Sequence, residues 1–212
     1  FMLAAALLSM WVSNTATTLM LLPVAYAVLE ASDSKDGVNP LAVPLFLGIA
    51  YAASIGGLGT PIGSPPNVLF LKFYGEAVGQ VPSFVQWMLW ALPVVVIMIP
   101  ITALWVTRNL DQGRPVIIPE TGPWRAEERR VMVIFALTAI AWITLREPFG
   151  GWSTWLNAPT ANYAAVALTA VIIMFLVPDG RGGKLLDWQS ASSIQWGVLL
   201  LFAGGIAIAK AF

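Results

Sequence analysis

The sequence contains no cysteine and no histidine, and few of its 212 residues carry a charge. Without these two residue types the chain has no disulfide, no thiolate nucleophile, no histidine base and none of the usual zinc or haem ligands. Only 10% of the residues are charged, against about a quarter in ordinary soluble domains. Eleven basic and eleven acidic side chains give zero net charge, so the sequence has no electrostatic footprint for nucleic acid.

Long apolar runs are what the sequence does have. Asp, Glu, Lys and Arg are all absent from residues 1–29, 37–71, 77–107, 148–178 and 188–209. A run of about 18 apolar residues can cross about 30 Å of hydrocarbon as a helix. Several such runs predict an all-α polytopic membrane protein in a lipid bilayer. Because the sequence begins at Phe1 and stops inside an apolar run, we expect it to be an internal part of a longer, transporter-sized protein.

The first apolar run is interrupted by Ser13-Asn14-Thr15. Such residues are favoured at helix N-caps, where a side-chain oxygen accepts from free backbone N–H groups. Two short helices around this polar tip would form a re-entrant hairpin over residues 1–30. A single long helix, with its hydroxyl groups bonded back to the preceding turn, fits the residue count equally well.

A second interruption is richer in helix-breaking residues. Residues 56–67, the glycine–proline segment, contain four glycines and three prolines inside a charge-free run. Proline removes a backbone donor and glycine is the most flexible residue, so a regular helix cannot continue here. Irregular backbone at membrane depth is tolerated only where protein buries it or where it lines a watery cavity. We therefore predict a discontinuous transmembrane helix over residues 40–80.

The rest of the chain is more regular. We expect a transmembrane helix at 84–107 with Trp87 near its end as an interfacial anchor, a loop at 108–130, two further transmembrane helices within 131–178, and another element at 194–212. The 108–130 loop contains five arginines, and cytoplasmic loops carry an excess of basic residues. This loop is therefore predicted to be cytoplasmic.

The two interruptions indicate binding rather than catalysis. Helix N-termini attract anions, while exposed carbonyls, amides and hydroxyls suit a cation such as sodium, and transporters with broken helices use both devices. Neither tip contains a cationic side chain, so an anion bound here would depend on helix ends and on a co-bound cation. Catalytic residue types are absent from the apolar runs, which argues against an intramembrane enzyme.

The same residues carry a family resemblance. Residues 8–18, with Ser13-Asn14-Thr15 at their centre, resemble the hairpin signature of the divalent anion:sodium symporter family, and residues 51–67 are similar to its unwound helix. Residues 200–207 look like the element that opens the family's second inverted repeat. The resemblance implies an elevator-type transporter with two inverted repeats, forming a homodimer that moves dicarboxylates with sodium. The second Ser-Asn-Thr tip is absent from this sequence, so we expect half of the binding site to lie outside it.

The resemblance also implies roles for individual residues. The substrate contacts would be Ser13, Asn14, Thr15, Thr60 and Pro61. The sodium ligands would be Ser9, Ser13, Asn14 and the backbone carbonyl of Gly59. Asn67 and Ser64 match the motif but are expected to be structural.

Several alternatives stay open from the sequence. The same fold could exchange dicarboxylates without sodium, or carry sulfate or another oxyanion. A non-transporting structural membrane subunit is the alternative from another class. No cofactor is implied beyond the sodium ion, and a bacterial inner membrane is the simplest location.

Overall fold

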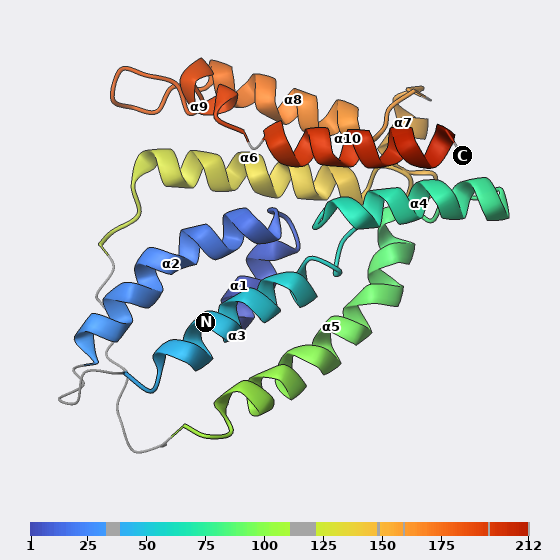
Figure 1. Ribbon diagram of the computed structural model, residues 1–212. Helices are drawn as coiled ribbons and strands as arrows, with labels where there is room; N and C mark the ends of the chain where they lie inside the picture. Colours follow the sequence, from blue (N-terminus) through green and yellow to red (C-terminus); the bar gives the residue numbers. More distant parts are fainter. Residues whose placement is uncertain (33–38, 111–121, 148, 159, 195, 212) are drawn as a thin grey trace. The chain divides into compact units, whose positions relative to one another are not determined.

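The computed structural model describes residues 1–32, 39–110, 122–147, 149–158, 160–194 and 196–211. Within these ranges the regular structure is helical, apart from one isolated antiparallel bridge between Pro178 and Lys184 (Figure 1). The predicted all-α class is therefore confirmed. The helices are α1 Met2–Ser9, α2 Asn14–Ala31, α3 Ala42–Gly56, α4 Pro65–Val78, α5 Phe84–Thr107, α6 Ala126–Ile143, α7 Gly151–Trp155, α8 Tyr163–Leu176, α9 Trp188–Ser192 and α10 Trp196–Ala211. They divide into two compact units, residues 1–122 and 123–212.

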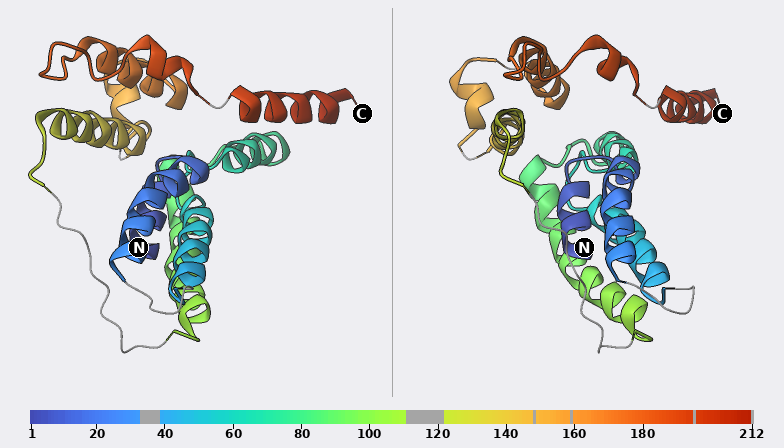
Figure 2. Two further views of the ribbon diagram at one scale, coloured as in Figure 1. Left: turned by 60° about the vertical axis from the view of Figure 1, so that its left-hand side comes forward. Right: turned by 90° about the vertical axis from the view of Figure 1, so that its left-hand side faces the viewer.

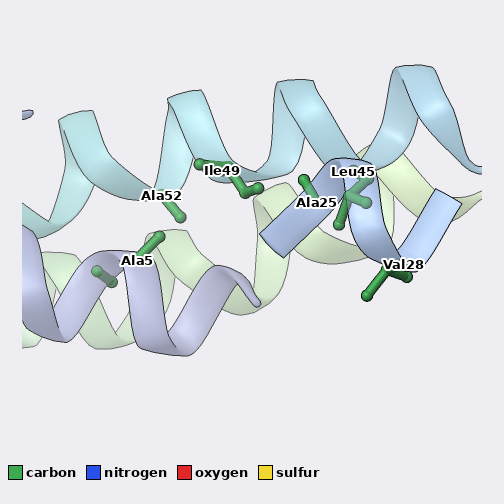
Figure 3. Close-up of a cluster of buried hydrophobic side chains, with 7 residues drawn as sticks. Ala5, Ala25, Val28, Leu45, Ile49 and Ala52 are labelled. Carbon is green, nitrogen blue, oxygen red and sulfur yellow. The ribbon is translucent and has the colours of Figure 1, made fainter. Parts of the chain in front are cut away.

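In the first unit α3 is the central helix. It packs against α1, α2 and α5, and both views of Figure 2 show these four helices side by side. The core where they meet is built largely from small and branched apolar side chains (Figure 3): Ala5, Ala6, Ala25, Val28, Leu45, Ile49 and Ala52. Small side chains allow helix backbones to approach closely. Such close packing is typical of helices that associate inside a lipid bilayer, where the hydrophobic effect does not favour their association.

The first two helices are separate. α1 ends at Ser9, α2 begins at Asn14, and residues 10–13 form the hairpin turn between them. Ser13 leaves the helical conformation with φ −56° and ψ 145°, and its hydroxyl accepts from the N–H of Ala16 at 3.3 Å. This cap satisfies one of the free donors at the start of α2. The continuous helix that the residue count left open is not formed.

The glycine–proline segment also separates two helices. α3 ends at Gly56, and α4 begins after Ser64 with Pro65 in its first turn, where a proline costs no backbone hydrogen bond. α4 ends at Val78, and Gly79 after it has a φ of 79°, the left-handed conformation typical of the residue that follows a helix.

In the second unit α6 packs against α8. α6 begins at Ala126, five residues before the predicted boundary at 131, so the loop predicted over 108–130 is too long at its C-terminal end. Glu127 and Glu128 lie in the first turn of α6, where the helix dipole favours negative charge. Residues 111–121 of that loop lie outside the described residues.

Helix lengths limit which elements can cross a bilayer. Among the described residues, only α5 is long and apolar enough to do so, by length and composition. α3 and α8 are apolar but have 15 and 14 residues, against about 20 for a full crossing. The two transmembrane helices predicted within 131–178 correspond to α6 and α8, and their crossing of a bilayer stays a prediction.

Candidate functional site

The hairpin turn and the glycine–proline segment are held together by Thr60. Its hydroxyl donates to the backbone carbonyl of Met10 and accepts from the N–H of Gly63 at 3.1 Å. The Thr60 side chain is completely buried. A single hydroxyl therefore connects two backbone interruptions that lie 50 residues apart in the sequence.

Asn67 fixes the path of the glycine–proline segment from within α4. Its amide group donates to the carbonyls of Gly57 and Thr60 at 2.7 and 2.8 Å, and its side-chain oxygen accepts from the Ser64 hydroxyl at 3.1 Å. Asn67 is only 4% exposed, so these carbonyls would lose a buried partner without it. Both residues make hydrogen bonds within the segment, as the structural role predicted for them requires.

Ser9 and Asn14 form the polar centre of the hairpin. The Ser9 hydroxyl donates to the Asn14 side-chain oxygen at 2.8 Å, and Ser9 is fully buried. A Cβ atom at Gly57 would lie 2.4 Å from that Asn14 oxygen. The Asn14 side chain therefore occupies the space that glycine leaves open at position 57, and the two predicted sodium ligands Ser9 and Asn14 are in direct contact.

Backbone carbonyls gather beside Gly63. A Cβ atom built there would lie 2.5 Å from the carbonyl oxygen of Gly57, 2.9 Å from that of Met10 and 3.0 Å from that of Ser9. Three carbonyl oxygens from two distant segments thus crowd the Cα atom of Gly63, and only glycine fits at this position. The carbonyl of Met10 already accepts from Thr60, which holds the two segments together, and the carbonyl of Gly57 accepts from Asn67.

The other predicted site residues divide by exposure. Ser13 and Thr15 are exposed at the start of α2, Asn14 is partly buried between them, and Thr60 and Pro61 are buried. Gly59 is buried beside Met10, and its N–H donates to the Gly56 carbonyl at 2.8 Å. A ligand arriving at the hairpin tip would therefore meet Ser13, Asn14 and Thr15, while Thr60 and Pro61 stand behind them.

Thr17, one turn into α2, has an unsatisfied hydroxyl. The residue is completely buried, and its oxygen has no hydrogen-bond partner among the described residues. The neighbouring Thr18 differs, since its hydroxyl donates to the Asn14 carbonyl at 2.8 Å. A buried hydroxyl without a partner costs about 1–3 kcal/mol of stability.

This contrast predicts opposite effects for two matched substitutions. Thr17→Val should raise the thermal unfolding midpoint of the purified intact protein in sodium-free buffer, because it removes an orphaned polar group at nearly unchanged volume. Thr18→Val should lower the midpoint, because it breaks a hydrogen bond. A lower midpoint for Thr17→Val would mean that its hydroxyl has a partner elsewhere in the intact protein.

The described residues contain no cluster of three or more His, Cys, Asp or Glu side chains that could hold a metal ion. The oxygens at the two interruptions are neutral, and the N-terminus of α2 adds the positive end of a helix dipole. The two interruptions thus bring together hydroxyl, amide and backbone groups rather than charged side chains.

Comparison with known proteins places this geometry in a family. The citrate transporter (CitMHS) family matches the chain over residues 1–212. The chain belongs to this family. It is 32% identical to the sodium-dependent dicarboxylate transporter SdcS of Staphylococcus saprophyticus, over 99% of the chain and 44% of the relative. It is 33% identical to the protein of the same name from Staphylococcus aureus, with the same coverage.

These similarities confirm the resemblance to sodium-coupled dicarboxylate transporters that the two sequence motifs carry. As a member of the citrate transporter family, the chain is part of an integral membrane protein and belongs with transporters rather than enzymes. The chain spans less than half the length of these curated relatives.

Several residues of this site were not identified from the sequence. Met10 accepts the Thr60 hydroxyl with its backbone carbonyl. Gly57 leaves room for the Asn14 side chain, and Gly63 leaves room for neighbouring carbonyl oxygens. None of these three residues therefore has a side chain that would mark it as part of the site.

Trp87 was expected to anchor α5 at the membrane interface. Its indole N–H donates to the Leu58 carbonyl at 2.8 Å, which ties α5 to the glycine–proline segment. Its place at the membrane interface stays a prediction. No pattern in the sequence indicated the contact with Leu58, because the two residues lie 29 positions apart.

Proposed function

We propose that the intact protein transports dicarboxylates such as succinate, malate or fumarate together with sodium. The observation that carries this proposal is the contact between Ser9 and Asn14, whose side-chain oxygen lies beside Gly57 where the hairpin turn meets the glycine–proline segment. Neutral hydroxyl and amide oxygens suit a monovalent cation such as sodium. The names of the relatives, sodium-dependent dicarboxylate transporters, supply the substrate class.

In the proposed site the sodium ion lies among Ser9, Ser13, Asn14 and the carbonyl of Gly59. The Ser9 hydroxyl, which donates to Asn14 in the structure, would turn so that both oxygens face the ion. Rotation of one hydroxyl is a small change. The buried position of Ser9 and Gly59 then protects the ion from water, which strengthens its electrostatic interactions.

One carboxylate of the substrate lies at Ser13, Asn14 and Thr15, at the N-terminus of α2, with Thr60 and Pro61 forming the wall behind it. Hydroxyl and amide donors together with the helix dipole favour an anion there. No cationic side chain stands at either tip, so the sodium ion supplies the compensating charge. Anion binding and sodium binding then support each other, which is the physical basis of coupling.

The proposed transporter works by an elevator movement, with the α1–α2 hairpin and the broken α3–α4 element belonging to the moving domain. The second half of the site comes from an inverted repeat that begins near α10, and two copies of the protein form a homodimer. Its location is the bacterial inner membrane. The α1–α2 hairpin is re-entrant and opens toward the cytoplasm, on the same side as the arginine-rich loop.

Uptake of labelled succinate into proteoliposomes containing the intact protein tests the proposal. One set of vesicles has an inward sodium gradient, and a second lacks sodium but contains unlabelled succinate. We expect uptake only in the first set. Uptake confined to the second would make the protein an exchanger, and uptake inhibited by citrate or sulfate rather than by malate would reassign the substrate.

A further inference from the structure

The second unit carries a charged cluster where the start of α6 meets the loop after α8. Glu127 contacts Arg181 at 2.9 Å and Arg125 at 3.7 Å, and Arg125 also contacts Glu128 at 2.8 Å. These ion pairs connect the start of α6 to the loop that follows α8. Trp124, directly before Arg125 in the sequence, is 62% exposed, and tryptophan is enriched where membrane proteins meet the membrane–water interface.

The acidic side chains of this cluster are already engaged. Glu127 and Glu128 are paired with arginines. Asp179 accepts from the backbone N–H groups of Arg181 and Gly183 at 2.7 and 2.9 Å, and these bonds hold the pKa of its carboxyl below the usual range. The remaining acid, Asp187, accepts from the N–H of Ser190 at the start of α9.

Three basic side chains are left without a carboxylate partner among the described residues. Arg130 donates to the Pro178 carbonyl, and Lys184 donates to the Leu176 carbonyl at 2.7 Å, at the negative end of the α8 dipole. Arg129 is exposed and forms no ion pair with the residues that the structure describes. With five basic and four acidic side chains, the cluster carries one net positive charge, and Arg129 and Arg130 stand apart from its ion pairs.

Two of these basic residues border an apolar cavity. The cavity has a volume of about 470 Å³ and lies between the first turns of α6 and the end of α8. Its lining consists of Ala126, Arg129, Arg130, Val133, Ile134 and Val177. The side chains of Arg129 and Arg130 therefore border four apolar side chains, and the Arg130 guanidinium group also reaches the Pro178 carbonyl at the end of α8. Glu127 and Glu128 line a different cavity of the same unit.

We propose that this cavity binds one anionic phospholipid. The phosphate would be held by Arg129 and Arg130, since guanidinium groups match phosphate oxygens with two parallel hydrogen bonds. An acyl chain would cover Val133 and Ile134. Basic pockets between membrane helices on the cytoplasmic side are suited to such headgroups. A soluble anion would satisfy the arginines but leave the apolar lining in water, so a lipid is the ligand that matches both parts.

Native mass spectrometry of the intact protein tests this proposal. The protein is purified, equilibrated with equal amounts of phosphatidylglycerol and phosphatidylcholine, and the lipids that stay bound are counted. We expect preferential retention of phosphatidylglycerol. Arg129→Gln should lower the ratio of the two retained lipids about fivefold, and the double change with Arg130→Gln should lower it further. Circular dichroism and size-exclusion elution verify that the variants are folded.

Arg146→Gln is the matched control, because Arg146 is exposed and lies beyond the opposite end of α6. It should leave the lipid ratio unchanged. The proposal is overturned if the wild-type protein shows no preference for phosphatidylglycerol, or if Arg146→Gln lowers the ratio as much as Arg129→Gln. Displacement of phosphatidylglycerol by millimolar inorganic phosphate would likewise overturn it in favour of a soluble anion.

Discussion

Replacing Asn14 by alanine is expected to raise the sodium concentration for half-maximal succinate uptake about 10- to 100-fold. The substitution removes the oxygen that Ser9 contacts at 2.8 Å, and a hydrogen-bonding or ion-binding group of this kind contributes about 1.5–3 kcal/mol. The space beside Gly57 would be left empty rather than refilled by another oxygen. The measurement is initial uptake into proteoliposomes across a series of sodium concentrations.

A control at the other end of α2 separates sodium binding from general damage. Asn39 also uses its amide, donating to the carbonyls of Leu29 and Ser32 at 3.2 and 3.0 Å. Asn39→Ala should lower the unfolding midpoint but leave the sodium dependence of uptake unchanged. If Asn14→Ala kept the wild-type sodium response at normal expression, the assignment of Asn14 to the sodium site would be wrong.

The helical class of this chain follows directly from its charge-free runs, because only a helix satisfies its own backbone in hydrocarbon. Whether each charge-free run forms one unbroken helix or two shorter ones does not follow from the sequence. Ser13-Asn14-Thr15 can cap a new helix or bond back within an old one, and the residue count is the same for both. The choice is made by tertiary contacts, in which Thr60 binds the carbonyl of Met10 just before the tip.

Charged residues caused the clearest error in the predicted boundaries. Residues 126–130 are rich in charge and were assigned to a loop, yet they form the first turns of α6. The carboxylate of Glu128 accepts from the backbone N–H of Arg125 at 3.0 Å and thereby caps the helix. Charge at a helix N-terminus favours the helix when it is acidic, so polarity alone is a poor guide to where such a helix begins.

The geometry of the candidate site was the least predictable part. The motifs identify hydroxyl and amide side chains, but the carbonyls of Ser9, Met10 and Gly57 converge only because two segments about 50 residues apart pack together. Nothing in the local sequence indicates that Thr60 is fully buried while Thr15 is exposed. The roles of these residues in binding sodium and substrate stay predictions.

Replacing Gly56 by alanine is expected to destabilise the first unit by about 3 kcal/mol. Gly56 ends α3 where it crosses α1, and a Cβ atom there would lie 2.2 Å from the carbonyl oxygen and 2.5 Å from the Cα atom of Ala6. Both atoms belong to the backbone, so no side chain can turn away and the two helices must separate. Separation moves the hairpin that carries Ser9 and Asn14, and uptake should fall with stability.

Gly48→Ala provides the comparison within the same helix. A Cβ atom at position 48 would meet only the Met2 side chain, at 3.1 and 3.2 Å, and a flexible methionine can shift. Alanine also favours a helix over glycine by about 1 kcal/mol, so this variant should be as stable as the wild type or slightly more. Thermal unfolding of both variants measures the difference. Equal midpoints would show that α1 and α3 do not depend on backbone contact at Gly56, and the close packing that positions the hairpin would need another explanation.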